Sequence, residues 1–167
     1  KNFFLINIDE ELSTISIYEN SSLVFFKTFS FGTNLIYRDL SQLCSIKNDE
    51  VRSILNEVNF NNKNENKKKY IDQKFFEQSQ YTKLSISHFR DIIDTRIQEM
   101  MNYLFNKNSN LNYFKNRLSQ VYVVFENKVF SENLGEIFKG HLNLNSDKIA
   151  LKQITLDDLS LLGVAEL

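Results

Sequence analysis

Three consecutive carboxylates, Asp9, Glu10 and Glu11, follow an apolar run near the start of the chain and precede Leu12. Carboxylate oxygens are ligands that calcium and magnesium prefer, so this group could bind a divalent cation. The same residues also have the composition of an ordinary solvated turn. One short loop supplies no second set of ligands, and the three residues by themselves leave both interpretations open.

Other residues that could carry chemistry are few. His88 and His141 lie far apart in the sequence, with no serine or cysteine pattern around either, so a nucleophilic triad has little support. Cys44 is the only cysteine, which excludes an intrachain disulfide and a multi-cysteine metal site, and suits a reducing cytoplasm. It stands near Leu40 and Leu43, so we expect a buried, inert thiol.

The composition excludes further classes of function. The 167 residues carry 20 basic and 21 acidic side chains, and the net charge of −1 gives no general attraction to nucleic acid. No stretch approaches the roughly 20 apolar residues of a membrane span, and no signal peptide precedes the first strand. We therefore expect one folded unit that neither binds nucleic acid nor enters a bilayer by itself.

The first part of the chain predicts three strands followed by two helices. Strands are expected at residues 3–8, 13–18 and 23–30, separated by segments of turn composition. After Gly32 the apolar period becomes helical, with Thr33 or Asn34 as the cap. The inner face of this helix is predicted to be Ile36, Leu40 and Leu43. A second helix, capped by Asn48 or Asp49, follows with an inner face of Val51, Ile54, Leu55 and Val58.

The middle of the chain contains its strongest periodic signal. Residues 59–69 are polar and of low complexity, which predicts a flexible loop, and residues 70–83 predict one or two strands around Phe75 and Phe76. A core helix is expected over about residues 87–106. Its apolar residues recur every three or four positions, at Phe89, Ile93, Ile97, Met100 and Leu104.

The remaining segments complete an α/β pattern. The continuous apolar run at residues 121–125 suits a buried strand. A helix over residues 131–138, capped by Ser131, and a final strand pair near residues 142–154 follow it. Strands and helices in this order predict the α/β class.

Two segments of the sequence resemble the second actin-fold domain of FtsA, a bacterial cell-division protein family. The segment from Leu5 to Leu40 resembles the first strands and helix of that domain, through Ile15, Ile17, Tyr18, Gly32, Asn34, Asp39 and Leu40. The segment FRDIIDTRIQEM resembles the long helix of the family, through Ile92, Ile93, Arg96 and Glu99. The two matches occur in the right order and at the right distance, and they cover almost the whole chain as that one domain.

The resemblance implies a fold and a division into two parts. The fold would be an actin-like (ribonuclease H-like) α/β domain with a small inserted α+β subdomain. Residues 1–44 and 118–167 would form the larger subdomain, and residues 45–117 the smaller one. The other actin-fold half would precede Lys1, and a membrane-targeting amphipathic helix would follow Leu167. Contact with the membrane would then come only through segments outside this chain, at the cytoplasmic face.

The resemblance also implies that the nucleotide site is degenerate. Glycine-rich hairpin loops hold phosphate in this fold, because their backbone N–H groups approach anionic oxygens without intervening side chains. In this sequence the leading metal-serving carboxylate aligns with Asn7, the three glycines with Asp9, Glu10 and Glu11, and the threonine with Leu12. Three carboxylates beside phosphate would each cost on the order of a kcal/mol or more. The alignment also makes a metal site at these residues unexpected.

Two further positions of the alignment agree with this interpretation. The second phosphate loop aligns with Glu126, Asn127 and Lys128, and we expect Lys128 to lie near Glu10 or Glu11. The adenosine-contacting helix of the family keeps its glutamate here, as Glu50, but loses its lysine. Glu50 is therefore the one position where a nucleotide contact could persist. We expect no ATP, magnesium or other metal, no catalytic residue and no ATPase activity.

These residues predict a non-catalytic scaffold of the cell-division machinery. By resemblance it would recruit the tubulin-like ring protein FtsZ, besides other division proteins, and self-association is left open. Lys83, Arg90, Arg96 and Glu99 are the candidate residues for binding the C-terminal tail of FtsZ. Pairing of Arg96 with Glu99 inside the helix is an equal alternative. The rival functions are a working ATP-binding half from the actin, heat-shock and sugar-kinase superfamily, or an actin-like pilus assembly protein.

Overall fold

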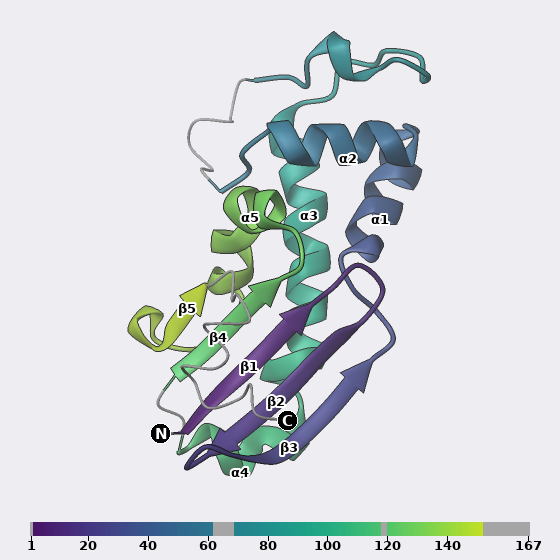
Figure 1. Ribbon diagram of the computed structural model, residues 1–167. Coiled ribbons are helices and arrows are strands. Elements are labelled where there is room, and N and C mark those ends of the chain that lie inside the picture. The colour runs from purple at the N-terminus through teal and green to yellow at the C-terminus, as the bar shows by residue number, and fades with distance from the viewer. Residues whose placement is uncertain (1, 62–68, 118–119, 152–167) are drawn as a thin grey trace.

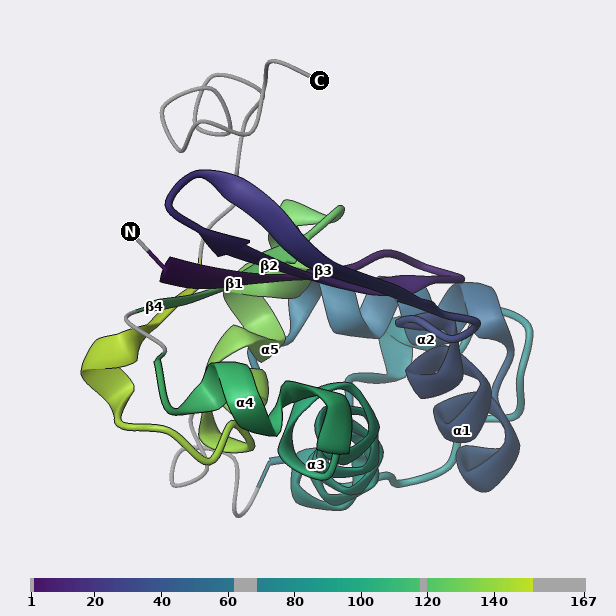
Figure 2. The ribbon, with the colours of Figure 1, turned by 90° about the horizontal axis from the view of Figure 1, so that it is seen from below.

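A five-stranded sheet covered by helices forms the framework of the molecule. The computed structural model describes residues 2–61, 69–117 and 120–151. The strands have the order β3-β2-β1-β4-β5, and the labelled helices lie on one face of the sheet (Figure 2). This arrangement confirms the predicted α/β class. In the described ranges, no helix combines the length and apolarity needed to cross a membrane.

The three N-terminal strands form the predicted antiparallel meander (Figure 1). They are β1 (Asn2–Ile8), β2 (Ser13–Glu19) and β3 (Ser22–Phe29), and β3 is an edge of the sheet. Asn20 and Ser21 connect β2 to β3 with φ angles of 51° and 67°. A two-residue turn with positive φ at both positions matches the twist of a hairpin, and asparagine tolerates this conformation well.

The last two strands extend the sheet in parallel. β4 (Gln120–Phe125) pairs with β1, and β5 (Ile149–Leu151) pairs with β4. The inward side chains of β4 are buried, as its apolar run predicted. Of the strand pair predicted near residues 142–154, the described residues contain β5, and residues 152–154 lie outside them.

Two helices follow the meander, and the predicted burial of one residue in the first helix is wrong. They are α1 (Asn34–Cys44) and α2 (Asn48–Glu57). Leu43 was predicted to face the core but is 66% exposed. Tyr37 and Cys44 are buried instead, which turns the inner face of α1 away from Leu43. The N-cap position of α2 is Lys47, not the predicted Asn48 or Asp49.

The segment between α2 and the next helix differs from its predicted structure. Phe60 is fully buried and stacks on Phe89 with ring centroids 5.9 Å apart, although residues 59–69 were predicted to form a flexible loop. Residues 62–68 of that loop are not among the residues that the structure describes. No strand forms at residues 70–83. A 3-10 turn, Gln73–Phe75, occurs there instead, because the side chain of Asp72 accepts a hydrogen bond from Lys74 N and starts the turn.

The predicted long helix is confirmed, and its last turn is unusual. α3 (Ile86–Met101) buries four of the five predicted apolar residues. Asn102–Asn106 continues it as a π-helical turn, which buries the fifth, Leu104. The short α4 (Asn112–Lys115) follows. α5 (Lys128–Gly140) is longer than predicted, because Asn127 caps it in place of Ser131.

Most of the buried apolar side chains form one cluster that draws on residues 2–44, 45–117 and 120–151, whereas Phe3 and Tyr18 are buried outside it and stack on each other. Its largest fully buried members are Phe4, Phe60, Phe89, Phe105 and Phe138. Each such side chain stabilises the fold by about 1.5–3 kcal/mol relative to full exposure. The predicted boundary between a larger and a smaller subdomain stays a prediction.

Candidate functional site

The two loops predicted to be degenerate phosphate loops lie at the same edge of the sheet. β1 and β4 are parallel, and Ile8 at the end of β1 is opposite Phe125 at the end of β4. The segments that follow these two residues therefore leave the sheet side by side. In open α/β sheets, ligands bind beyond the carboxyl ends of the parallel strands, so this edge is where a ligand of the fold would be held.

The first loop, residues 9–12, is fastened to the N-terminus of α1 through its backbone. Asp9 N donates to Leu12 O at 2.9 Å, which closes the turn. The carbonyl oxygens of Asp9 and Glu10 accept hydrogen bonds from Thr33 N and Asn34 N, both at 2.9 Å. The first N–H groups of a helix have no partner inside the helix. Here the loop satisfies the N–H groups at the start of α1.

This close approach requires Gly32. A Cβ atom at Gly32 would lie 2.2 Å from the carbonyl oxygen of Asp9 and 2.5 Å from that of Glu10. Both oxygens belong to backbone that cannot move without breaking the sheet or the helix start. The side chain of Ser13 adds a further tie, donating to Phe31 O at 2.7 Å. Gly32 is one of the residues that carry the sequence resemblance, and local packing explains why a glycine is needed at this position.

The carboxylates of the first loop have protein partners. Glu10 forms an ion pair with Arg52 of α2, whose guanidinium lies 4.3 Å from the ring centroid of Tyr37. The hydrogen bond to Glu10 raises the pKa of Arg52 above its usual value. Asn34 Nδ2 donates to Glu11 Oε1 at 2.6 Å. The described partners of Glu10 and Glu11 are thus Arg52 and Asn34.

The remaining residues of this loop complete a compact turn. Asn7 Nδ2 donates to Asp9 Oδ1 at 2.9 Å, so the position aligned with a metal-serving carboxylate holds an amide that bonds within the loop. Leu12 is exposed. Within the residues the structure describes, no three Asp, Glu, His or Cys side chains are placed to hold a metal ion.

The second loop has a structural role at the start of α5. The side chain of Asn127 accepts hydrogen bonds from Val129 N at 2.9 Å and from Phe130 N at 3.3 Å. This is the geometry of a helix N-cap. Glu126 is exposed beside it. The structure does not describe the side chain of Lys128, so its predicted approach to Glu10 or Glu11 stays a prediction.

The carboxylate of Glu50 is buried and accepts four hydrogen bonds from other residues. Its carboxylate accepts hydrogen bonds from Gln78 N at 2.8 Å, Lys47 N at 2.9 Å and Ser79 N at 3.0 Å, and from the hydroxyl of Ser79. Burial raises its pKa, but the hydrogen bonds from Ser79, Gln78 and Lys47 together outweigh this and lower the pKa of Glu50 to about 2. Glu50 therefore anchors the segment around Ser79 to the start of α2.

Arg96 links α3 to α1. Its Nε donates to Asp39 Oδ2 at 2.5 Å, and its NH1 group donates to Glu99 Oε2 at 2.8 Å. The intrahelical pair with Glu99 confirms one of the two predicted alternatives. Asp39 lies 57 residues earlier in the sequence, and no local pattern indicated this partner. Hydrogen bonding to Asp39 raises the pKa of Arg96.

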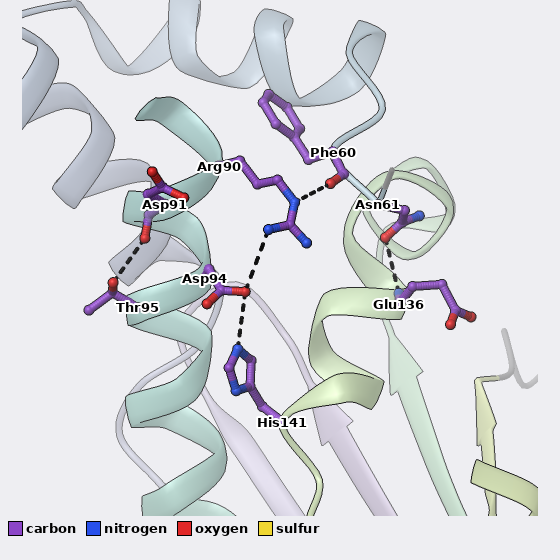
Figure 3. Close-up of polar contacts among 8 residues, drawn as sticks. All are labelled: Phe60, Asn61, Arg90, Asp91, Asp94, Thr95, Glu136 and His141. Carbon is purple, nitrogen blue, oxygen red and sulfur yellow. Dashed lines mark hydrogen bonds and ion pairs between the residues drawn. The ribbon is translucent and has the colours of Figure 1, made fainter. Parts of the chain in front are cut away.

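Arg90 faces a different side of α3. Its Nε donates to Phe60 O at 2.8 Å, and its NH1 group lies 3.9 Å from Asp94 Oδ1. The same Asp94 oxygen lies 3.2 Å from Nε2 of His141, beyond the end of α5 (Figure 3). Asn61 adds a further link by accepting a hydrogen bond from Glu136 N at 3.1 Å. This network ties the loop after α2 to α3 and α5.

The four residues predicted to bind a partner peptide do not converge. Arg96 and Glu99 are at the side of α3 that meets α1, whereas Arg90 faces Phe60 and the α5 side. Lys83 is exposed, and its Nζ lies 4.4 Å from the ring centroid of Tyr70. Six residues of helix separate Arg90 from Arg96, which turns their side chains about a third of a turn apart.

Comparison with known proteins identifies the fold. No protein-family model and no curated protein matches the sequence. Among solved structures, the ethanolamine utilization protein EutJ from Carboxydothermus hydrogenoformans matches 98% of this chain over 48% of its own, with 15% identity and a TM-score of 0.60. MreB 5 of Spiroplasma citri, bound to AMPPNP, matches 98% of this chain over 51% of its own, with 13% identity and a TM-score of 0.58.

A third match is to Ta0583, an archaeal actin homolog, at 13% identity and a TM-score of 0.54, over 98% of this chain and 46% of that one. The chain thus spans about half the length of the proteins it resembles. At these identities the similarity concerns the fold. The chain has the actin-like fold, over a length that corresponds to half of such a protein.

Proposed function

We propose that this chain is half of a non-catalytic, actin-like scaffold protein that acts by binding other proteins. The observation that carries the proposal is the first loop, residues 9–12, at the carboxyl ends of β1 and β4. Its three carboxylates replace residues that must lack side chains for backbone N–H groups to reach phosphate. Negative charge beside a triphosphate opposes binding in addition to this steric effect.

The internal contacts of the same loop support the proposal. Two of its carbonyl groups are bonded to the N-terminus of α1, and Glu10 and Glu11 are held by Arg52 and Asn34. Glu50, the one position where a nucleotide contact could persist, is enclosed by four hydrogen bonds from the protein. A nucleotide would have to displace these contacts before it could bind.

The more specific form of the proposal is an FtsA-like role, in which the protein recruits FtsZ to the cytoplasmic face of the membrane during cell division. Its support is the pair of sequence matches. Residues from the two matching segments are also in contact with each other. Asp39 belongs to the first matching segment and Arg96 to the second, and their side chains form an ion pair between α1 and α3. The membrane attachment of such a protein would depend on segments outside this chain.

A thermal scan of the full-length protein tests the non-catalytic function. ATP, ADP and AMPPNP, each with magnesium, are expected to leave the melting temperature unchanged, with magnesium alone as the control. A ligand at 100 times its Kd would stabilise the folded protein by about 2.7 kcal/mol, which such a scan detects easily. A magnesium-dependent rise with nucleotide would favour the working ATP-binding half instead.

Co-sedimentation with FtsZ polymers from the same organism tests the specific role. We expect the full-length protein to pellet with FtsZ polymers and to remain in solution without them. Absence of co-sedimentation would refute the FtsZ-recruiting role but leave the non-catalytic scaffold standing. The two experiments therefore separate the general proposal from its specific form.

A further inference from the structure

A surface groove runs between α1 and α3 on the side where Arg96 meets Asp39. Two neighbouring hollows form it, and Arg96 and Glu99 line both. One hollow also contains Phe31, Leu35 and Tyr103. The other hollow extends along the two helices to Leu43 and His88.

Exposed apolar side chains mark both ends of this α1–α3 groove. Tyr103 is 72% exposed and Leu43 is 66% exposed. Tyr103 belongs to the π-helical turn that continues α3, and such turns are frequent at functional sites. Phe31 lies beside it, with ring centroids 6.5 Å apart. Large aromatic side chains of this kind carry much of the energy in protein interfaces.

The length of the groove suits a short helical segment. His88 and Tyr103 are fifteen positions apart on one continuous helical stretch, which corresponds to roughly 22 Å. The apolar residues Leu35 and Leu43 are eight positions apart on α1, about two turns, and so present the same side of that helix. A partner helix of about fifteen residues could therefore contact apolar side chains at both ends of the groove and charged side chains between them.

The charges of the groove are mainly negative. Asp39, Asp91 and Glu99 line it against one guanidinium, that of Arg96, which already pairs with Asp39 and Glu99. A further cation, Lys107, lines a separate hollow beside Tyr103. Like charges placed opposite each other reject a partner, whereas opposite charges raise its rate of association and its specificity.

We infer that the α1–α3 groove is a docking site for a basic amphipathic helix of a partner protein, with lysine or arginine residues flanking its apolar face. The inference rests on the proposed scaffold function and names the chemistry of its partner. It differs from the sequence-based expectation of an acidic tail at Arg96, because the structure shows that internal carboxylates already engage this guanidinium.

A fluorescence anisotropy titration with two labelled peptides tests the inference. One is a sixteen-residue amphipathic helix of leucine and lysine, and the other has glutamate at every lysine position. The lysine peptide is expected to bind the full-length protein at least about tenfold more tightly at low salt, and less tightly as ionic strength rises. Equal binding of both peptides, or no binding of either, would overturn the inference.

Four variants locate the binding. Tyr103→Ser and Asp91→Lys alter exposed groove residues and are expected to weaken binding of the lysine peptide at least about fivefold. Phe26→Ser and Glu77→Lys are the matched controls, because Phe26 is an exposed aromatic residue on β3 and Glu77 an exposed acid outside the groove. Controls that weaken binding as much as the groove variants would show non-specific attraction and overturn the assignment.

The outcome of the peptide titration is independent of the thermal scan with nucleotides. Peptide binding at the groove together with a nucleotide-dependent rise in melting temperature would refute the non-catalytic function alone. No rise and no peptide binding would refute the groove alone.

Discussion

Gly32 lies so close to Asp9 that a Cβ atom at this glycine would sit 2.2 Å from the Asp9 carbonyl oxygen. The contact holds residues 9–12 against the start of α1, through Thr33 N and Asn34 N. The geometry of the candidate site therefore depends on a residue that has no side chain.

Gly32→Ala is expected to destabilise the protein by about 1–3 kcal/mol or more, because the added methyl group forces backbone apart. Urea unfolding monitored by circular dichroism measures this change. Gly140→Ala is the matched control, since a Cβ at that position would have no described atom within 4 Å other than those of its chain neighbours and its own helix backbone. We expect Gly140→Ala to be neutral or slightly stabilising. Equal stabilities of the two variants would show that the Gly32 contact does not constrain the fold.

The carboxylate of Glu50 is expected to make stability depend on pH. Its pKa is about 2 in the folded protein, below the value of roughly 4.3 for an unperturbed glutamate. A lowered folded-state pKa contributes stability that is present above the unfolded-state pKa and is lost as the pH falls toward 2. The contribution at pH 7 is roughly 2–3 kcal/mol.

Glu50→Gln should remove this contribution. Urea unfolding at pH 7, 4 and 2.5 is expected to show a large deficit of the variant at pH 7 that shrinks at pH 2.5. Glu57→Gln, at an exposed carboxylate paired with Lys74, is the control and should change stability by no more than about 0.5 kcal/mol. A deficit of Glu50→Gln that is constant across pH would mean that its hydrogen bonds do not depend on the charge.

The ion pair between Glu10 and Arg52 is expected to contribute little energy, despite its position at the candidate site. Its side chains are 44% and 39% exposed, and exposed pairs are worth at most about 1 kcal/mol. A double-mutant cycle of Glu10→Gln and Arg52→Met should give a coupling energy of that size, decreasing in 1 M salt. A coupling of several kcal/mol would show that the pair, more than the backbone contacts at Gly32, holds the loop.

Cys44 is expected to be inert in the folded protein. It is buried at the end of α1, and burial raises the pKa of its thiol, so little reactive thiolate forms at neutral pH. A chromogenic disulfide reagent at pH 8 should react slowly with native protein and rapidly in 6 M guanidinium chloride. Comparable rates in both conditions would place the thiol at the surface.

Local patterns in the sequence were sufficient to predict much of the fold. The meander of β1 to β3, the long helix α3 and the buried strand β4 each follow from the spacing of apolar residues within one segment. Such spacing reports which face of an element is buried, and that information is local. The absence of glycine at Asp9, Glu10 and Glu11 is also read directly from the sequence, and the loss of nucleotide binding that it implies stays a prediction.

Contacts between distant segments could not be predicted from the sequence. Asp39 and Arg96 are 57 residues apart, and only the packing of α1 against α3 brings them together. The same packing leaves Leu43 exposed in the α1–α3 groove, although its helical spacing favoured the core. Glu50 has an ordinary helix-start pattern, and only the approach of Gln78 and Ser79 encloses its carboxylate. Tertiary structure decides such features because side-chain partners and exposure depend on how whole elements pack.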